Sequence, residues 1–127
     1  MYKFEKIGEN HFYLKAIGTF PPSVANRFIK EFKERTKNLK EFSVIVDGLD
    51  FILLHVKSFE IILDFLKENN EKLVRSAYII AQNPILDKEA QILLSKAESP
   101  KRKIVSNFND AKEWIGLKDI IIKKNKK

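Results

Sequence analysis

The stretch that decides the fold is FSVIVDGLDFI, residues 42–52. Its first five residues are mostly apolar and β-branched, and an Asp-Gly pair follows them. Residues of this kind are enriched in strands, and Asp-Gly is common turn chemistry. A short apolar run that stops at a turn signal is typical of a buried strand. We therefore predict a buried strand over residues 42–46.

The chain before this strand predicts a β-hairpin and then a helix. Residues 2–6 alternate apolar and charged side chains, residues 11–17 are strand-like and rich in aromatic ones, and the GEN sequence between them suits a turn. After Ser23, a good helix N-cap, apolar residues such as Phe28 and Phe32 recur at helical spacing. This pattern predicts an amphipathic helix of about four turns.

The chain after residue 52 predicts further helices and strands in alternation. The expected elements are a helix over 59–73 with Ser58 as its N-cap, a strand over 77–81, a helix over 87–97, a strand over 101–106, and a short helix that Asn109 caps and Gly116 ends. The third helix would start after Asn83-Pro84, which closes the strand before it.

The resulting order, ββαβαβαβα, predicts the fold class. Strands that alternate with helices favour a mainly parallel sheet with helices on its faces. We expect one α/β domain over residues 1–116, with an opening hairpin, a five-stranded mixed sheet and about four helices. Residues 117–127 would be a basic C-terminal tail.

Composition excludes several classes of site. The chain has 127 residues and no Cys, which removes disulfides, thiolate nucleophiles and Cys-ligated zinc. The net charge is +7, but residues 118–127 hold five Lys and one Asp, so +4 of it lies there. The remaining +3 argues against a nucleic-acid surface on the domain. We expect no signal peptide and no membrane span, which would favour a cytoplasmic protein.

The order of elements, with an apolar strand that ends in Asp, a short loop and Phe51-Ile52, resembles the STAS (anti-sigma-factor antagonist) family. The segment FNDAKEWIG, residues 108–116, is similar to the closing short helix of that family. The related SpoIIAA-like group, which shares a fold description with lipid carriers of the Sec14 type, matches equally well. The resemblance covers residues 2–116 in topology and implies a bacterial regulatory domain.

One departure concerns the switch residue that the resemblance implies. The best-known members carry Asp-Ser-Ser-Gly before the second helix, and a partner kinase phosphorylates a Ser there. Here the position falls near Leu54 or His55, and only Ser58 offers a hydroxyl. A phosphate on Ser58 would lie at the positive end of the helix dipole, which is physically tolerable. The candidate partner-interaction or switch residues are Asp50, His55, Lys57 and Ser58.

Other constellations favour structural explanations over chemistry. Asp47 and Asp50 at a strand end could hold magnesium or serve phosphate transfer, but side-chain hydrogen bonds that shape a turn explain them better. His55 is a lone loop histidine, and the only other histidine, His11, lies on the hairpin. The glycines stand singly and form no phosphate-binding loop. We therefore predict no catalytic residues, no metal and no cofactor.

The expected function is a non-catalytic, regulatory protein-interaction module. Its partner would be a protein, such as a regulatory kinase or a second copy of the chain, and its surface the loop over 47–58 with the start of the second helix. The alternative is a carrier that binds a lipid or another small apolar ligand under a movable helix. The Lys-rich tail could make weak contact with an anionic membrane, but a frayed terminus explains it more simply.

Overall fold

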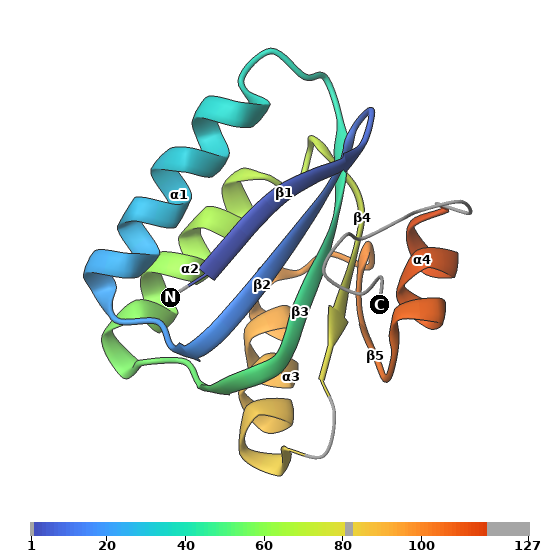
Figure 1. Cartoon of the computed structure of the whole chain (residues 1–127). Coiled ribbons are helices and arrows are strands. Elements are labelled where there is room, and N and C mark those ends of the chain that lie inside the picture. Colours follow the sequence, from blue (N-terminus) through green and yellow to red (C-terminus); the bar gives the residue numbers. More distant parts are fainter. Residues whose placement is uncertain (1, 81–82, 117–127) are drawn as a thin grey trace.

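The computed structural model describes residues 2–80 and 83–116, so the predicted tail over 117–127 lies outside the described residues. Figure 1 shows one sheet with helices on both faces. The elements are β1 (Tyr2–Gly8), β2 (His11–Thr19), α1 (Pro22–Thr36), β3 (Phe42–Leu53), α2 (Val56–Glu68), β4 (Leu73–Ile79), α3 (Pro84–Ala97), β5 (Arg102–Val105) and α4 (Phe108–Ile115).

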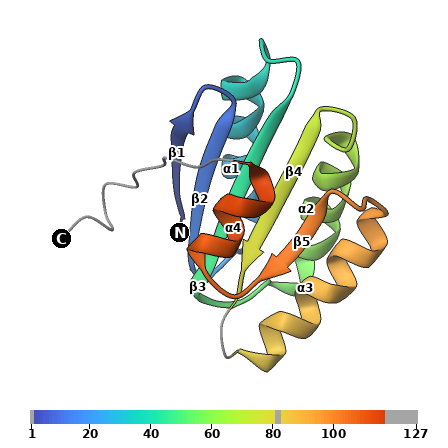
Figure 2. The same cartoon turned by 90° about the vertical axis from the view of Figure 1, so that its right-hand side faces the viewer.

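The sheet has five strands in the order β1-β2-β3-β4-β5. Strands β1 and β2 pair antiparallel, and the other three pairs are parallel. Each parallel connection adds one helix and advances in the same direction, so α1, α2 and α3 cover one face of the sheet and α4 covers the other (Figures 1 and 2). The predicted fold class, a single α/β unit with a five-stranded mixed sheet and four helices, is confirmed.

The largest difference from the predicted elements is the length of β3. It continues past Asp47 to Leu53, where a turn and loop were expected. Beyond Asp47 it pairs with β2 alone, after a register shift in which Lys15 faces Asp47 and Ile17 faces Asp50. The extra residue makes a β-bulge, which bends a strand without ending it. Gly48 suits this position, because a Cβ atom on it would lie 3.1 Å from the Ile79 carbonyl oxygen, which is closer than most such contacts.

Three predicted N-caps are wrong by two or three positions. Helix α1 starts at Pro22 after Pro21, so Ser23 lies inside its first turn. His55 caps α2 in place of Ser58, and Asn107 caps α4 in place of Asn109. Helix α3 starts at Pro84, three residues early, because the Asn83 side chain accepts a hydrogen bond from the Leu86 backbone N–H.

The end of the second predicted helix and the start of the strand after it also shift. Helix α2 stops at Glu68, and Leu73 is the first residue of β4 in place of the last helical one. The Leu73 side chain is buried in β4. An apolar residue at this position would be expected in a buried helix as well as in a buried strand, so its apolar character did not distinguish the two.

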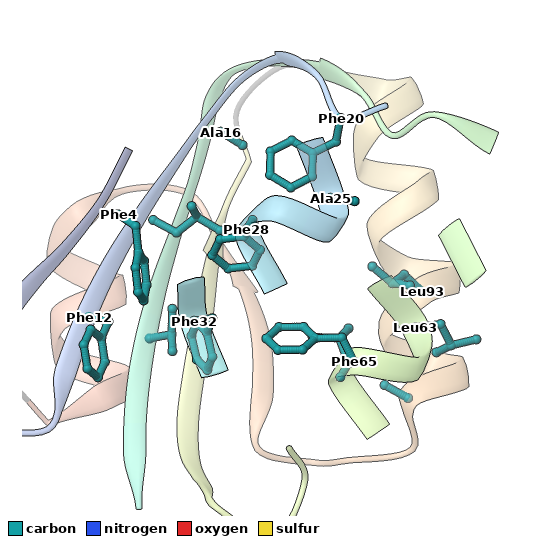
Figure 3. Packing of buried hydrophobic residues seen from close by; sticks show 14 of the residues in the cluster. Phe4, Phe12, Ala16, Phe20, Ala25, Phe28, Phe32, Leu63, Phe65 and Leu93 are labelled. Carbon is teal, nitrogen blue, oxygen red and sulfur yellow. The ribbon is translucent and has the colours of Figure 1, made fainter. Parts of the chain in front are cut away.

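Two hydrophobic cores lie on the two faces of the sheet. The larger one, under α1 to α3, is rich in phenylalanine, and Figure 3 shows Phe28, Phe32 and Phe65 from the helices against Phe4 and Phe12 from the sheet. The smaller one, under α4, contains Tyr13, Ile45, Ala77, Ile79, Val105, Ala111 and Ile115. Phe28 and Phe32, which were predicted on the apolar face of the first helix, are buried.

Candidate functional site

The carboxyl edge of the sheet holds a linked set of polar side chains on β2 and β3. Lys15 Nζ lies 2.8 Å from Asp50 Oδ2 and 3.7 Å from Asp47 Oδ2. Hydrogen bonding to Lys15 and its charge hold the pKa of Asp50 below its usual value, and the hydrogen bond to Asp50 raises the pKa of Lys15. The predicted candidate Asp50 is therefore an exposed carboxylate paired with a lysine from the neighbouring strand.

Asp47 has a structural environment. It is buried, it accepts a hydrogen bond from the hydroxyl of buried Tyr13, and its Oδ1 accepts another from the Leu49 backbone N–H at 3.0 Å. Burial, and then the hydrogen bond to Asp47, raise the pKa of Tyr13 strongly. The hydrogen bond to Leu49 agrees with the predicted local role of Asp47, although the segment is a bulge within β3.

Two of the other candidates, His55 and Lys57, lie at the start of α2 and are exposed. The imidazole Nδ1 of His55 accepts a hydrogen bond from the Lys57 backbone N–H at 3.3 Å, which makes His55 the N-cap. Sequence reasoning missed this role because Ser, Thr, Asp and Asn are the usual N-caps. In the described part of the chain, no hydrogen bond or ion pair joins His55 or Lys57 to Asp50.

Ser58 lies in the first turn of α2 and not at the predicted N-cap position. Its side chain is fully buried, and its hydroxyl donates a hydrogen bond to the Phe20 carbonyl oxygen. This bond ties the first turn of α2 to the segment between β2 and α1. A buried hydroxyl that already donates to the backbone is not presented to a kinase in this conformation. The prediction that Ser58 is the N-cap of the second helix is wrong, because His55 takes that position.

An exposed apolar patch lies beside these candidates. We call the side chains of Ile52, Val56 and Ile85 the carboxyl-edge patch; they are 58%, 84% and 66% exposed. The amide of Asn83 donates to the Ile52 carbonyl oxygen at 3.1 Å and so holds the start of α3 against the end of β3. Ile52 and Val56 belong to the segment 47–58 that the sequence predicted as the partner surface. Ile85 lies outside this segment and comes near it only in the tertiary fold.

Leu54, in the loop between β3 and α2, is buried. Its backbone N–H donates to Glu89 Oε1 of α3 at 2.9 Å. The segment between β3 and α2 therefore divides its apolar residues, since Leu54 turns into the core and Val56 turns outward.

A cavity of about 150 Å³ lies between the sheet and helices α1 to α3. Its walls are mainly apolar and include the rings of Phe20, Phe28 and Phe65. Ser76 and Arg102 also line it, from the strands β4 and β5. The sequence analysis allowed for an apolar ligand but assigned none of these residues to a ligand site. The cavity walls come from segments far apart in the chain, so no local pattern marks them.

The described residues contain no group of three His, Asp or Glu side chains that could hold a metal ion. None of the described helices has the length and apolar character that a membrane span requires.

The fold is that of SpoIIAA-like proteins. No protein-family model and no curated protein matches the sequence. Among solved structures, an uncharacterised DUF3478-family protein with a SpoIIAA-like fold from Shewanella loihica PV-4 superposes with a TM-score of 0.70 at 14% identity, over 91% of this chain and 92% of that one. The anti-sigma factor antagonist SpoIIAA in its unphosphorylated form gives a TM-score of 0.64 at 9% identity, over 94% and 100%. The predicted STAS/SpoIIAA-like fold is confirmed.

Proposed function

We propose that this chain is a non-catalytic, regulatory protein-interaction module that docks through the carboxyl-edge patch. The observation that carries the proposal is the exposure of Ile52, Val56 and Ile85 together at the edge of a SpoIIAA-like fold. Functional loops of parallel sheets gather at the carboxyl ends of the strands, and exposed apolar patches mark binding sites. We place the protein in the bacterial cytoplasm as part of the same proposal.

The partner that this surface suits is a protein with an apolar contact region and a mixed charged rim. Asp50, His55 and Lys57 are exposed and lie next to Ile52 and Val56 in the chain, and Asp50 and Lys57 offer both signs of charge. Paired and complementary charges at a rim steer association and fix its register. By analogy with the anti-sigma factor antagonist SpoIIAA, an anti-sigma-type regulatory kinase is the partner class that we favour, and a second copy of the chain is the alternative.

Binding would not depend on a phosphorylated serine in the second helix. Ser58 is enclosed and bonded to the Phe20 carbonyl oxygen, and a phosphate there would have to leave the core. We therefore propose that the interaction is regulated by the amount of partner and not by phosphorylation of Ser58.

The experiment compares partner capture by variants of the patch and of a distant surface. Tagged protein is expressed in its native cell, and captured proteins are identified by mass spectrometry. Ile52→Glu and Val56→Glu should abolish capture, because a buried charge without a partner opposes association. Val74→Glu is the matched control, since Val74 is also apolar and exposed (41%) but lies at the start of β4, at the amino ends of the parallel strands. Equal capture by all three variants would contradict the proposal.

A further pair of variants tests the charged rim. Lys57→Glu reverses one charge, and His55→Asp introduces another while keeping an acceptor that caps α2. Both should keep the melting temperature and slow capture. Unchanged capture by the double variant would place the partner surface elsewhere.

A second candidate function is a carrier of a small apolar ligand. The observation that favours it is the apolar cavity of about 150 Å³ under α1 to α3. Mass spectrometry of small molecules extracted from the purified native protein tests it. A ligand that co-purifies in stoichiometric amount supports this function, and an empty native protein opposes it.

A further inference from the structure

Two buried hydrogen-bond donors on the face of the sheet under α1 to α3 have no acceptor in the protein. They are the Ser76 hydroxyl, on a side chain that is 1% exposed, and the Arg102 Nε–H group. An unsatisfied buried polar group costs folding free energy, so native structures satisfy nearly all of them. Two such donors in one place indicate a group that is supplied from outside the chain.

The two donors are neighbours and line the same cavity. Ser76 on β4 and Arg102 on β5 are register partners in adjacent parallel strands, so their side chains leave the same face of the sheet. Both line the cavity under α1 to α3. Tyr78, two residues along β4, also lines it and completes a polar end in a space that is otherwise apolar.

The guanidinium of Arg102 is held in a fixed position. Its Nη2 donates to the Leu66 carbonyl oxygen at 2.7 Å and to Asn70 Oδ1 at 2.9 Å, and its Nη1 donates to the Tyr78 hydroxyl at 3.3 Å. These bonds use the two terminal nitrogens and leave Nε–H unused. The Tyr78 hydroxyl accepts in this arrangement, so its own proton can serve as a third donor.

The charge of Arg102 is not neutralised by a neighbouring acid. Across residues 2–80 and 83–116, no carboxylate lies within ion-pair distance of its guanidinium. Glu89 also lines the cavity, but its Oε1 accepts the Leu54 backbone N–H at 2.9 Å, where α3 meets the end of β3. Arg102 is half-buried, and its enclosed Nε–H beside apolar walls favours an anion, because charges removed from water are stable when they are paired.

The size of the cavity limits the body of the ligand. A volume of about 150 Å³ with mainly apolar walls suits a molecule of roughly benzene size. The rings of Phe32, Phe42 and Phe65 also line the cavity, and Phe42 lies on β3 close to the register position of Ser76. They suit an aromatic or short aliphatic group.

We propose that the cavity binds a small monocarboxylate, with its apolar body among the phenylalanines and its carboxylate on Ser76 and Arg102. The inference rests on the second candidate function, the carrier, and adds the chemistry of its ligand. A carboxylate has two oxygens, which match the Ser76 O–H and the Arg102 Nε–H. A phosphate monoester presents more oxygens than these donors can satisfy.

The experiment measures binding of benzoate and of toluene to the full chain by calorimetry, with amide chemical shifts of β4 and β5 as a second readout. Both ligands have a body of the right size, and only benzoate has the carboxylate. Benzoate should bind at least roughly tenfold more tightly than toluene, because hydrogen bonds to a charged group are the strong ones.

Ser76→Ala should weaken benzoate roughly tenfold, leave toluene unchanged and preserve the melting temperature. Arg102→Gln should weaken benzoate at least as much. Its matched control is Lys103→Gln, which removes one positive charge from the adjacent residue of β5. Lys103 lies on the opposite face of the sheet, where its Nζ is 5.1 Å from the centre of the Trp114 ring of α4. Lys103→Gln should keep benzoate binding.

The outcomes separate this inference from the function on which it rests. Tighter benzoate binding that Ser76→Ala reduces and Lys103→Gln keeps supports the carboxylate site. Equal binding of toluene and benzoate, unaffected by Ser76→Ala, overturns the inference but leaves an apolar carrier. Failure of both probes to bind at millimolar concentration overturns the inference and the carrier function together, and the carboxyl-edge patch is then tested on its own.

Discussion

The face of the sheet under α4 and the face under α1 to α3 bury polar groups in different ways. Under α4, the Tyr13 hydroxyl and the Asp47 carboxylate bond to each other, and Lys15 and the Leu49 N–H contribute further contacts to Asp47. Under α1 to α3, Ser76 and the Nε of Arg102 have no protein acceptor and line a cavity. The Tyr13–Asp47 network is complete within the chain, whereas the donors of Ser76 and Arg102 need another group. His11 Nδ1, at the start of β2, also has no protein partner, but His11 is not among the residues that line the cavity.

The two sets of buried polar groups therefore differ in role, since one stabilises the fold and the other is proposed to bind a ligand. A satisfied buried network stabilises and orients its own elements, whereas unsatisfied donors beside empty volume indicate binding. Lys15 and Asp50 extend the satisfied network to the surface near the carboxyl-edge patch. The α4 face therefore supports the position of the proposed docking surface, and the other face offers room for a ligand.

The largest expected effect is on the aromatic core. Phe32→Ala should lower the free energy of unfolding by about 3–5 kcal/mol, because truncating a buried Phe removes its burial and leaves a cavity. The ring of Phe32 lies 5.1–6.2 Å, centre to centre, from the rings of Phe4, Phe12, Phe28, Phe42 and Phe65. Urea denaturation measures the loss.

The control for this change is on the α4 face. Phe108→Ala removes a half-buried ring that contacts the ring of Tyr13 at 5.7 Å, so it should cost well under half as much. Similar losses for the two variants would mean that the phenylalanine cluster does not dominate stability.

The next effect tests the network under α4. Tyr13→Phe should cost about 1.5–3 kcal/mol, because it removes a hydrogen bond to a buried carboxylate. The pKa of Tyr13 is raised by folding, so its contribution is complete below the unfolded pKa of about 10 and is lost as the pH rises above it. Unfolding of the wild type above pH 10 should therefore be steeper with pH than that of Tyr13→Phe. Parallel curves would contradict the assignment.

A smaller effect concerns the buried serine that has a partner. Ser58→Ala should lower the free energy of unfolding by about 1–2 kcal/mol, since it leaves the Phe20 carbonyl oxygen without its donor. Denaturation midpoints at constant m-value measure it. Ser23→Ala, at an exposed position in the first turn of α1, is the control and should change little.

The smallest effect concerns Ser76, the buried serine whose hydroxyl has no hydrogen-bond partner in the protein. Ser76→Ala should change the free energy of unfolding by less than about 0.5 kcal/mol, because its hydroxyl has no protein acceptor to lose. The two serines are equally buried, so their comparison isolates the hydrogen bond. A loss for Ser76→Ala as large as that for Ser58→Ala would show that its hydroxyl is satisfied in the free protein, and the contrast between the two faces would fail.

The sequence alone determined the fold class and the complete element order. Apolar runs such as residues 42–46 and the helical spacing of Phe28 and Phe32 are local patterns, and they survive in the structure as β3 and α1. The candidates Asp50, His55 and Lys57 were found because they are polar residues at the end of a strand. Whether they contact a partner is a proposal that the variants above test.

Tertiary structure decided what local patterns do not encode. Pairing with β2 continued β3 past Asp47, packing against Phe20 buried Ser58, and Asn83 brought Ile85 beside Ile52. The juxtaposition of Ser76 and Arg102 depends on the parallel pairing of β4 with β5 across the intervening helix α3. Periodicity reports which face of its own element a residue occupies, whereas contacts between distant segments depend on the register and packing of the whole sheet.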